Sequence, residues 1–340
     1  MGSFDLSVTD MHTAGEPVRI VTGGYPALKG ASILDKRRDA KENHDALRRA
    51  LMLEPRGHAE MYGVIPVEPS DPRALFACLF MHGEGYSTMC GHATIALGRW
   101  LVESGRVAAV EPQTRFAIEV PCGVVELICD VARGRVTRTA FDSVPAFLAM
   151  EDLAIDVDGL GRVVCDVAYG GAIYAVLPSS RLGLDFFATP MDALRRAAVA
   201  ITDHIRKHVA IRHPVEPDLG FLYGTILTDD AAGNATTSNL CVFAEGQIDR
   251  SPTGSGVTAR MALDHAKGRI APGVARAFRG PTGVPLEAQI VGETKVAGLE
   301  RPAVTVRVAG SAHYTGEARF KLDPDDPLGI GFALPATFRP

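Results

Sequence analysis

The sequence predicts an α+β fold built from two similar halves, and three observations support this prediction. Short apolar runs separated by turn residues outnumber the helical stretches, which favours hairpins over regularly alternating strands and helices. The same order of elements occurs twice along the chain. The helix predicted after Cys90 is apolar around most of its circumference, which is typical of a helix enclosed by protein. We therefore expect each half to be a curved sheet rolled around one buried helix.

The composition indicates a globular protein and argues against several classes of partner. The 340 residues are 46% apolar and 22% charged, a balance that allows a core in two domains. The net charge is −5 and no cluster of Lys or Arg forms a stripe, so neither nucleic acid nor an anionic membrane is the expected partner. No apolar stretch reaches the roughly 18 residues of a membrane span.

The first residues and the cysteines predict a cytoplasmic protein. Residues 1–6 contain no basic segment followed by an apolar one, so we expect no secretory signal. The six cysteines are scattered, and no two of them form a CxxC pair. This spacing predicts reduced thiols rather than a disulfide framework or a zinc site.

The first half is expected to combine extended runs with two helical stretches. Three glycines in the loop at residues 83–92 are typical of a chain reversal before a helix. The predicted elements are an extended opening at 6–20, a helix at 40–53, strands at 61–67 and 74–81, a helix from this loop to about 104, and a hairpin of 124–131 with 135–141.

The second half repeats this plan, which indicates internal duplication. The hexapeptide DALRRA occurs at 45–50 and again at 192–197, and the pair Cys90-Gly91 aligns with Thr253-Gly254. We place the break between the halves near residues 144–156. The predicted elements are a strand region at 163–177, a helix at 191–209, strands at 221–227 and 236–244, a loop at 247–256 and a helix to about 267.

The two loop-to-helix junctions are the candidate site. The first N–H groups of a helix have no partners within it, and the helix dipole adds positive potential there. Two such ends can bind a small carboxylate, and Gly91 and Gly254 let the backbone approach it closely. The same field predicts a lowered pKa for the Cys90 thiol, which makes Cys90 a candidate base.

Other polar residues are weighed against structural roles. His92 adjoins Cys90 and is a candidate site residue, whereas Asp249 is either a site residue or the cap of a turn. His204 and His208 have the spacing of a metal pair, but no HExxH pattern accompanies them, so we predict no metal. The glycine-rich stretches match neither a P-loop nor a dinucleotide fingerprint, so we predict no nucleotide cofactor. The remaining cysteines (78, 122, 129, 165 and 241) are expected to be packing residues.

Three motifs together resemble the proline racemase family: MHTAGEP at 11–17, MCGHA at 89–93 and DRSPTGSG at 249–256. The resemblance implies a diaminopimelate epimerase-like fold of two pseudo-symmetric halves, no cofactor and a homodimer. It also implies that the last strand, around 330–334, returns to the first half. The expected half-domains are 1–145, completed by a strand at about 325–340, and 146–324.

The chain departs from the family's racemases at one position. Racemases and epimerases of the family carry a cysteine in both loops, whereas the second position here is Thr253. A threonine hydroxyl, with no adjacent base visible in the sequence, does not match a thiol as an acid or base. Thr at this position is similar to the family's trans-3-hydroxy-L-proline dehydratases, so we expect a hydro-lyase that acts on this imino acid.

The stereochemistry of that substrate agrees with a single base. Its C2 hydrogen and 3-hydroxyl lie on one ring face, so water leaves by syn elimination, giving Δ2-pyrroline-2-carboxylate that tautomerises to the Δ1 imine. Cys90 is the expected C2 base, and the same thiol or a water protonates the hydroxyl. The resemblance implies that the carboxylate is held by the N–H groups of Gly91, His92, Gly254 and Ser255. It also implies that Asp249, with His92, receives the ring ammonium. Thr253 then contacts the substrate or fills space, and Phe243 packs against the ring.

Two alternatives remain open from the sequence. The first is a proline racemase or 4-hydroxyproline 2-epimerase that protonates the second face through water or another residue. The second is a non-catalytic imino-acid-binding protein. A thiol at a helix start argues against the second, because binding alone does not require one.

Overall fold

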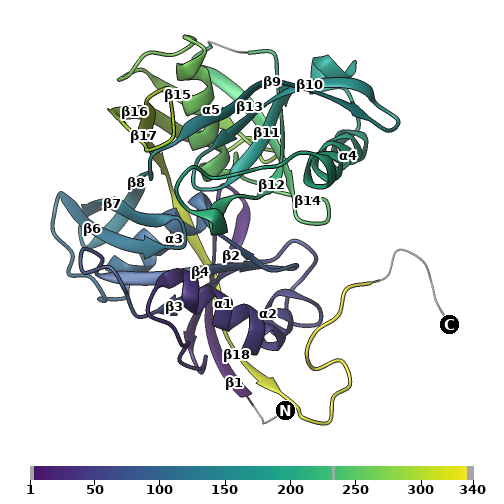
Figure 1. The fold of residues 1–340 in the computed structure, drawn as a ribbon. Helices are drawn as coiled ribbons and strands as arrows, with labels where there is room; N and C mark the ends of the chain where they lie inside the picture. The colour runs from purple at the N-terminus through teal and green to yellow at the C-terminus, as the bar shows by residue number, and fades with distance from the viewer. Residues whose placement is uncertain (1–3, 232–233, 335–340) are drawn as a thin grey trace.

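The protein forms two lobes that lie one above the other, and the chain passes between them twice (Figure 1). This computed structural model describes residues 4–231 and 234–334. The first lobe contains β1 (Phe4–Thr13), β2 (Glu16–Gly23), α1 (Ile33–Asn43), α2 (Asp45–Met52), β3 (Tyr62–Val67), β4 (Phe76–His82), β5 (Tyr86–Ser87), α3 (Gly91–Glu103), β6 (Gln113–Val120), β7 (Gly123–Ala132), β8 (Arg135–Asp142) and β18 (Ala312–Leu322).

The second lobe consists of the chain between β8 and β18. It contains β9 (Phe147–Val157), β10 (Gly161–Tyr169), β11 (Ile173–Pro178), the 3-10 turn η1 (Ser179–Leu182), α4 (Met191–His208), the 3-10 turn η2 (Pro217–Leu219), β12 (Leu222–Thr228), β13 (Thr236–Phe243), β14 (Gln247–Ile248), α5 (Gly254–Ala266), β15 (Ala275–Arg279), β16 (Pro285–Thr294) and β17 (Ala303–Gly310).

The pairing of the strands repeats between the lobes, which confirms the predicted pseudo-symmetric α+β fold. In the first lobe β18, β1 and β2 are antiparallel neighbours, β2 runs parallel to β3, and β4 runs parallel to β6. In the second lobe β9, β10 and β11 are antiparallel neighbours, β11 runs parallel to β12, and β13 runs parallel to β15. The strands of the two lobes therefore pair in the same order and directions, and the antiparallel pairing of β8 with β17 joins the two sheets.

Each lobe encloses one helix, α3 or α5, of 13 residues. Residues 91–102 of α3 and 254–264 of α5 are all buried. These helices carry Gly, Ala and Thr among the larger apolar residues, so the surrounding strands approach them from all sides. Both helices point their first residues toward the other lobe, and the core is continuous between the lobes (Figure 1).

The first helical stretch begins earlier than the sequence pattern predicts. Ser32 caps α1, because its hydroxyl accepts a hydrogen bond from the N–H of Asp35, and the Asp35 carboxylate accepts one from the N–H of Ser32. His44 then ends α1 and precedes α2. The predicted helix at 40–53 is therefore two helices that begin at Ile33 and Asp45. The two copies of DALRRA lie in α2 and α4, so they belong to helices that follow equivalent strands.

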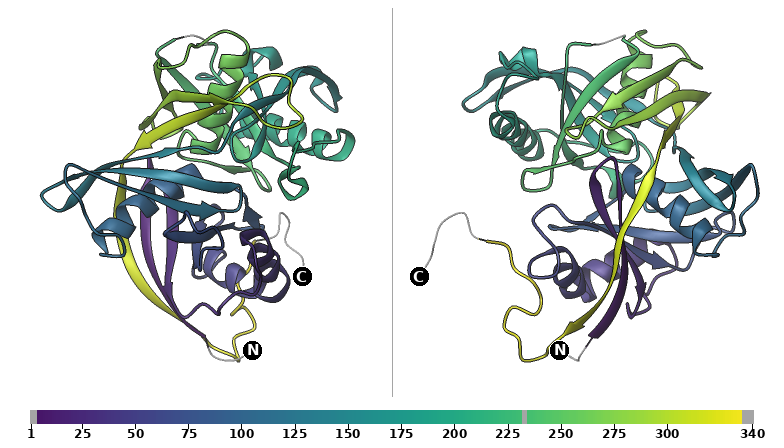
Figure 2. Two further views of the ribbon diagram at one scale, coloured as in Figure 1. Left: turned by 60° about the vertical axis from the view of Figure 1, so that its left-hand side comes forward. Right: turned by 180° about the vertical axis from the view of Figure 1, so that it is seen from behind.

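The strand that returns to the first lobe is β18, which lies ahead of the predicted range. β18 pairs along its length with β1, from Phe4 opposite Leu322 to Thr13 opposite Ala312, and Figure 2 shows it running from one lobe to the other. Residues 323–327 read DPDDP, and proline has no N–H to continue a ladder. Between residues 325 and 334 the structure shows only an isolated bridge of Phe332 with Glu54. The prediction of a strand at 325–340 is thus wrong for 325–334, and residues 335–340 lie outside the described part.

We propose that the chain divides into two half-domains where it crosses between the lobes. The end of β8 at Asp142 and the start of β9 at Phe147 bracket the predicted division between residues 145 and 146. In the described residues, no helix is both long enough and apolar enough to cross a membrane.

Candidate active site

The two buried helices meet where they begin. Cys90 precedes the first residue of α3 and Thr253 precedes the first residue of α5. A Cβ atom built on Gly91 would lie 2.5 Å from the Cα atom of Gly254, closer than any real side-chain contact. The free N–H groups and positive dipole ends of two helices therefore face one small region between the lobes.

A cavity at this meeting point brings together all the residues predicted for the site. Its volume of about 10 Å³ has room for roughly one water molecule. An imino-acid ring needs more space, so we call this arrangement closed and expect the lobes to move apart before a ring enters. The lining contains the predicted Cys90, Gly91, His92, Phe243, Asp249, Thr253, Gly254 and Ser255, together with Tyr62, Met89, Tyr174 and Tyr223.

Cys90 and His92 form a contact pair in this cavity. The Sγ atom of Cys90 lies 3.2 Å from Nδ1 and 3.6 Å from Nε2 of His92. The hydroxyl of Thr13 donates to the main-chain oxygen of His92 at 2.8 Å, which ties the first turn of α3 to β1. A proton can pass directly between the thiol and the imidazole at this separation.

Burial sets the ionisation of this pair and corrects the sequence prediction for Cys90. Burial raises the pKa of the Cys90 thiol well above its ordinary value, outweighing the N–H of Ala93, and the carboxyl of Asp249 acts in the same direction as burial. Burial also lowers the pKa of His92 to about 3. The predicted lowering of the Cys90 pKa by the helix start is therefore wrong for the closed site. The closed site therefore holds a neutral Cys90 thiol beside a neutral His92 imidazole.

Thr253 has a base beside it that the sequence does not reveal. Its hydroxyl donates to Oδ2 of Asp249 at 2.8 Å, and the Asp249 carboxylate also accepts the N–H of Ser251 at 2.7 Å. Burial raises the pKa of Asp249 to about 6, against the lowering effect of these hydrogen bonds. A carboxylate of that basicity orients the Thr253 hydroxyl without removing its proton. Thr253 therefore carries protons far less well than a thiol would at this position.

The backbone at Thr253 is strained. Its φ is +65°, a conformation that β-branched residues rarely adopt and that costs about 1–3 kcal/mol. The N–H of Thr253 donates to the hydroxyl of Ser251 at 3.0 Å, and the Thr253 main-chain oxygen accepts the N–H of Val257 at 2.7 Å. These bonds hold the residue where its hydroxyl faces Asp249. Such strain is concentrated at functional sites.

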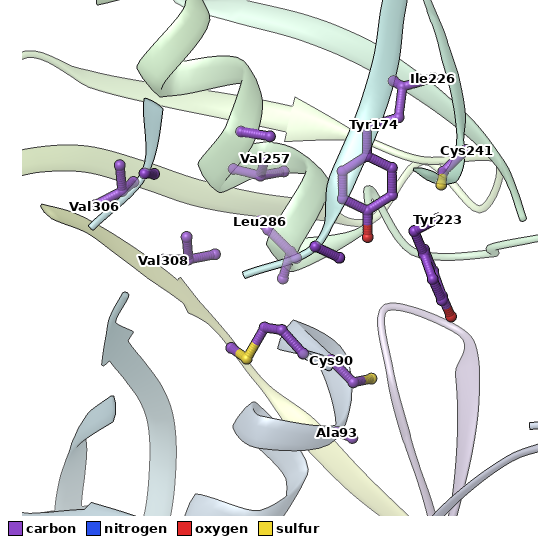
Figure 3. Packing of buried hydrophobic residues seen from close by; sticks show 14 of the residues in the cluster. Cys90, Ala93, Tyr174, Tyr223, Ile226, Cys241, Val257, Leu286, Val306 and Val308 are labelled. Carbon is purple, nitrogen blue, oxygen red and sulfur yellow. The ribbon is translucent and has the colours of Figure 1, made fainter. Parts of the chain in front are cut away.

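Aromatic side chains form a wall that the sequence analysis missed except for Phe243. Figure 3 shows Tyr174 and Tyr223 extending from the second lobe toward the start of the helix that follows Cys90. Tyr223 stacks on Phe243 with ring centres 5.4 Å apart, and the hydroxyls of Tyr174 and Ser255 lie 2.7 Å apart. Aromatic residues in strands look like core residues in a sequence, and here they form the core and the wall of the cavity at once.

The remaining candidates do not line this cavity, although Cys241 lies next to it, where its main-chain oxygen accepts the N–H of Asp249. All six thiols of the chain are free: Cys122 is half-buried and the other five are buried. His204 and His208 lie on α4 with ring centres 4.7 Å apart. In the described part of the chain, no group of three or more His, Cys, Asp or Glu residues has a metal-binding arrangement.

Comparison with known proteins shows which family this chain resembles. The family described as proline racemase matches residues 8–333. The trans-3-hydroxy-L-proline dehydratase of Homo sapiens is 48% identical, with 98% of this chain and 96% of that protein covered. The trans-L-3-hydroxyproline dehydratase of Xenopus tropicalis is 47% identical, with 97% and 95% covered.

A solved structure agrees with the sequence relatives. A hydroxyproline epimerase from Agrobacterium vitis, crystallised with bound trans-4-hydroxy-L-proline, superimposes with a TM-score of 0.92 at 28% identity, and 97% of this chain and 95% of that chain are covered. The family profile extends over nearly the whole sequence, and the fold is shared from the first lobe to the second. This chain therefore belongs to the proline racemase family.

Proposed function

We propose that this protein is a trans-3-hydroxy-L-proline dehydratase. The observation that carries the proposal is the asymmetry of the site: Cys90 offers a thiol from one helix start, and Thr253 offers only a hydroxyl from the other. Two-base racemisation needs an efficient proton carrier on each face, whereas syn elimination of water needs one. Relatives named for this dehydratase activity are 46–48% identical over at least 95% of this chain.

The Cys90–His92 contact supplies both proton transfers on one face. Burial disfavours a thiolate at Cys90 or an imidazolium at His92 alone, but the two opposite charges, 3.2 Å apart, stabilise each other. When substrate is bound, the thiol proton moves to His92, and the thiolate then takes the C2 proton. The C3–O bond breaks as the imidazolium gives its proton to the leaving hydroxyl. The products are water and Δ2-pyrroline-2-carboxylate, and the neutral pair is restored.

The helix starts and Asp249 orient the substrate for this step. The N–H groups of Gly91, His92, Gly254 and Ser255 bind the carboxylate and the negative charge that develops beside C2 in this proposal, which is supported by the position of these residues at the helix starts in the cavity lining. Asp249 is the buried carboxylate available to the ring ammonium. Thr253 hydrogen-bonds Asp249 and occupies the place of a second thiol. Phe243 and its stacked neighbour Tyr223 enclose the ring.

The test is incubation of the purified protein with trans-3-hydroxy-L-proline, reading imine formation with o-aminobenzaldehyde. L-proline and trans-4-hydroxy-L-proline in D₂O serve as controls. We expect an imine from the 3-hydroxy isomer and no inversion of the other two. Rapid inversion of L-proline without any imine would instead identify a racemase.

We also propose that the protein is a cytoplasmic homodimer, as the family resemblance implies. Sedimentation of the purified chain at micromolar concentration tests the dimer. A monomer that dehydrates at full rate would contradict that part of the proposal.

A further inference from the structure

Glu16 is a buried carboxyl group that the proposed reaction does not use. It begins β2 in the first lobe and is 0% exposed. Its Oε2 atom accepts the N–H of Arg250 from the second lobe at 2.7 Å. Its Oε1 atom is also buried and has no hydrogen-bond partner among the described residues. A buried carboxylate oxygen without a partner is costly, so this group points to an interaction that depends on its protonation.

That interaction is with Asp249, the residue next to Arg250. Asp249 is 4% exposed and already accepts the N–H of Ser251 and the hydroxyl of Thr253. The hydrogen bond from the N–H of Arg250 sets the Glu16 carboxyl beside the residue that precedes Arg250, and the carboxyls of Glu16 and Asp249 shift each other's pKa. Two ionised carboxylates have no hydrogen to share, whereas one proton on the pair completes a hydrogen bond between them.

The surroundings favour a proton on Glu16 rather than on Asp249. Burial, and then the charge of Asp249, raise the pKa of Glu16 well above its ordinary value. Asp249 keeps two hydrogen-bond donors of its own, which favour its ionised form. The other charged group facing Glu16 is the guanidinium of Arg250, which forms an ion pair with Glu60. The nearby thiols of Cys90 and Cys241 are neutral because burial raises the pKa of each.

We propose that Glu16 is a positioning residue that holds one proton in the closed site and donates it to Asp249, so that the pair carries a single negative charge. One negative charge matches the single ammonium of an imino acid. The statement that the pair matches an ammonium rests on the proposed function. The statement that the pair shares one proton depends only on the positions of Glu16 and Asp249.

The arrangement couples closure of the lobes to uptake of a proton. Glu16 and Asp249 belong to different lobes, and the 10 Å³ cavity requires the lobes to part before a ring enters. In the parted state water surrounds Glu16, and its carboxyl ionises in its ordinary range. On closure the carboxyls meet and the proton is taken up. The proton is lost again as pH rises through the raised pKa, so closure weakens toward alkaline pH.

The test is the pH dependence of binding of pyrrole-2-carboxylate, a planar ligand that does not react. Between pH 7 and 9 we expect the wild-type Kd to rise by up to tenfold per pH unit, since one proton is bound with the ligand. Glu16→Gln keeps the shape and always donates to Asp249, so its Kd should stay within a few-fold of the wild-type value at pH 7 and become independent of pH. Glu60→Gln is the matched control, because Glu60 also contacts Arg250 across the lobes but is not buried against Asp249. It should keep the wild-type slope.

A measurement on the wild-type protein alone provides a second check. Binding heats at pH 8 in phosphate and in Tris, which release different heats on ionisation, should show net proton uptake. A pH-independent wild-type Kd, or a Glu16→Gln variant that keeps the wild-type slope, overturns the shared proton. Normal dehydration with a flat slope rejects only this inference, and a steep slope without dehydration rejects only the proposed function.

Discussion

The Cα atoms of Gly91 and Gly254 come so close that a methyl group on either residue would overlap the main chain of the other lobe. The contact holds two helix starts against one small cavity, and no side chain separates them. Closure of the site is therefore built on backbone contact between the lobes.

Gly91→Ala should keep the lobes from closing. The new Cβ would meet the Cα of Gly254 at 2.5 Å, whereas a Cβ on Gly85 meets nothing within 4 Å. We expect kcat/KM for dehydration to fall by about 10²-fold or more, because the carboxylate no longer contacts both helix starts. Gly85→Ala is the control and should keep wild-type kinetics. Full activity of Gly91→Ala would show that contact between the helix starts is dispensable.

Cys90→Ser should abolish chemistry while sparing binding. A serine hydroxyl is far less acidic than a thiol, so the base is lost, and we expect turnover to fall by about 10²–10⁴-fold. Titration with pyrrole-2-carboxylate should give a Kd within a few-fold of wild type. Cys122→Ser changes a thiol outside the cavity and should leave turnover intact. Undiminished dehydration by Cys90→Ser would remove Cys90 as the base.

His92→Gln should slow dehydration by about 10²-fold or more, because Cys90 loses the acceptor of its thiol proton and the leaving hydroxyl loses its proton donor. The loss should be smaller, though not absent, for the 3-fluoro analogue of the same stereochemistry, since fluoride departs without prior protonation. The measurement is the ratio of kcat values for the two substrates in each protein. Equal losses for both substrates would contradict the donor role and leave His92 with activation of Cys90 or binding alone.

Thr253→Cys should open a second face to proton transfer. A thiol placed beside Asp249 and opposite Cys90 can carry a proton, so deuterium from D₂O should enter C2 of L-proline with inversion. Thr253→Ser keeps the hydroxyl and should not invert L-proline. The readout is NMR of C2 together with chiral chromatography. Rapid inversion of L-proline by the Thr253→Ser variant would contradict the role assigned to the missing thiol.

The sequence predicts most of the fold because the order of elements that it repeats corresponds to two lobes with the same strand pairing. The alignment of Cys90 with Thr253 places both residues before a buried helix, and the structure brings those helix starts together. The repeated strand order then follows. The start of α1 was missed because its cap, Ser32, lies ahead of the apolar pattern.

The parts of the site that the sequence does not predict depend on burial. The pKa of Cys90 was predicted in the wrong direction, since a sequence shows a helix start but not complete removal from water. Tyr174 and Tyr223 look like core residues until the cavity is seen. Glu16 stands in the motif at 11–17, yet its contact with the second lobe spans 234 positions of the chain, and no local pattern reveals such a contact.

The pairing of β1 with β18 determines the order in which the molecule is assembled during translation. The partner of Phe4 is Leu322, so β1 leaves the ribosome more than 300 residues before the strand that pairs with it. The second lobe contains all of its own strands between residues 147 and 310 and is complete before β18 emerges. The amino-terminal lobe is thus synthesised first and finished last, and a nascent chain halted before residue 312 exposes the edge of β1 to aggregation.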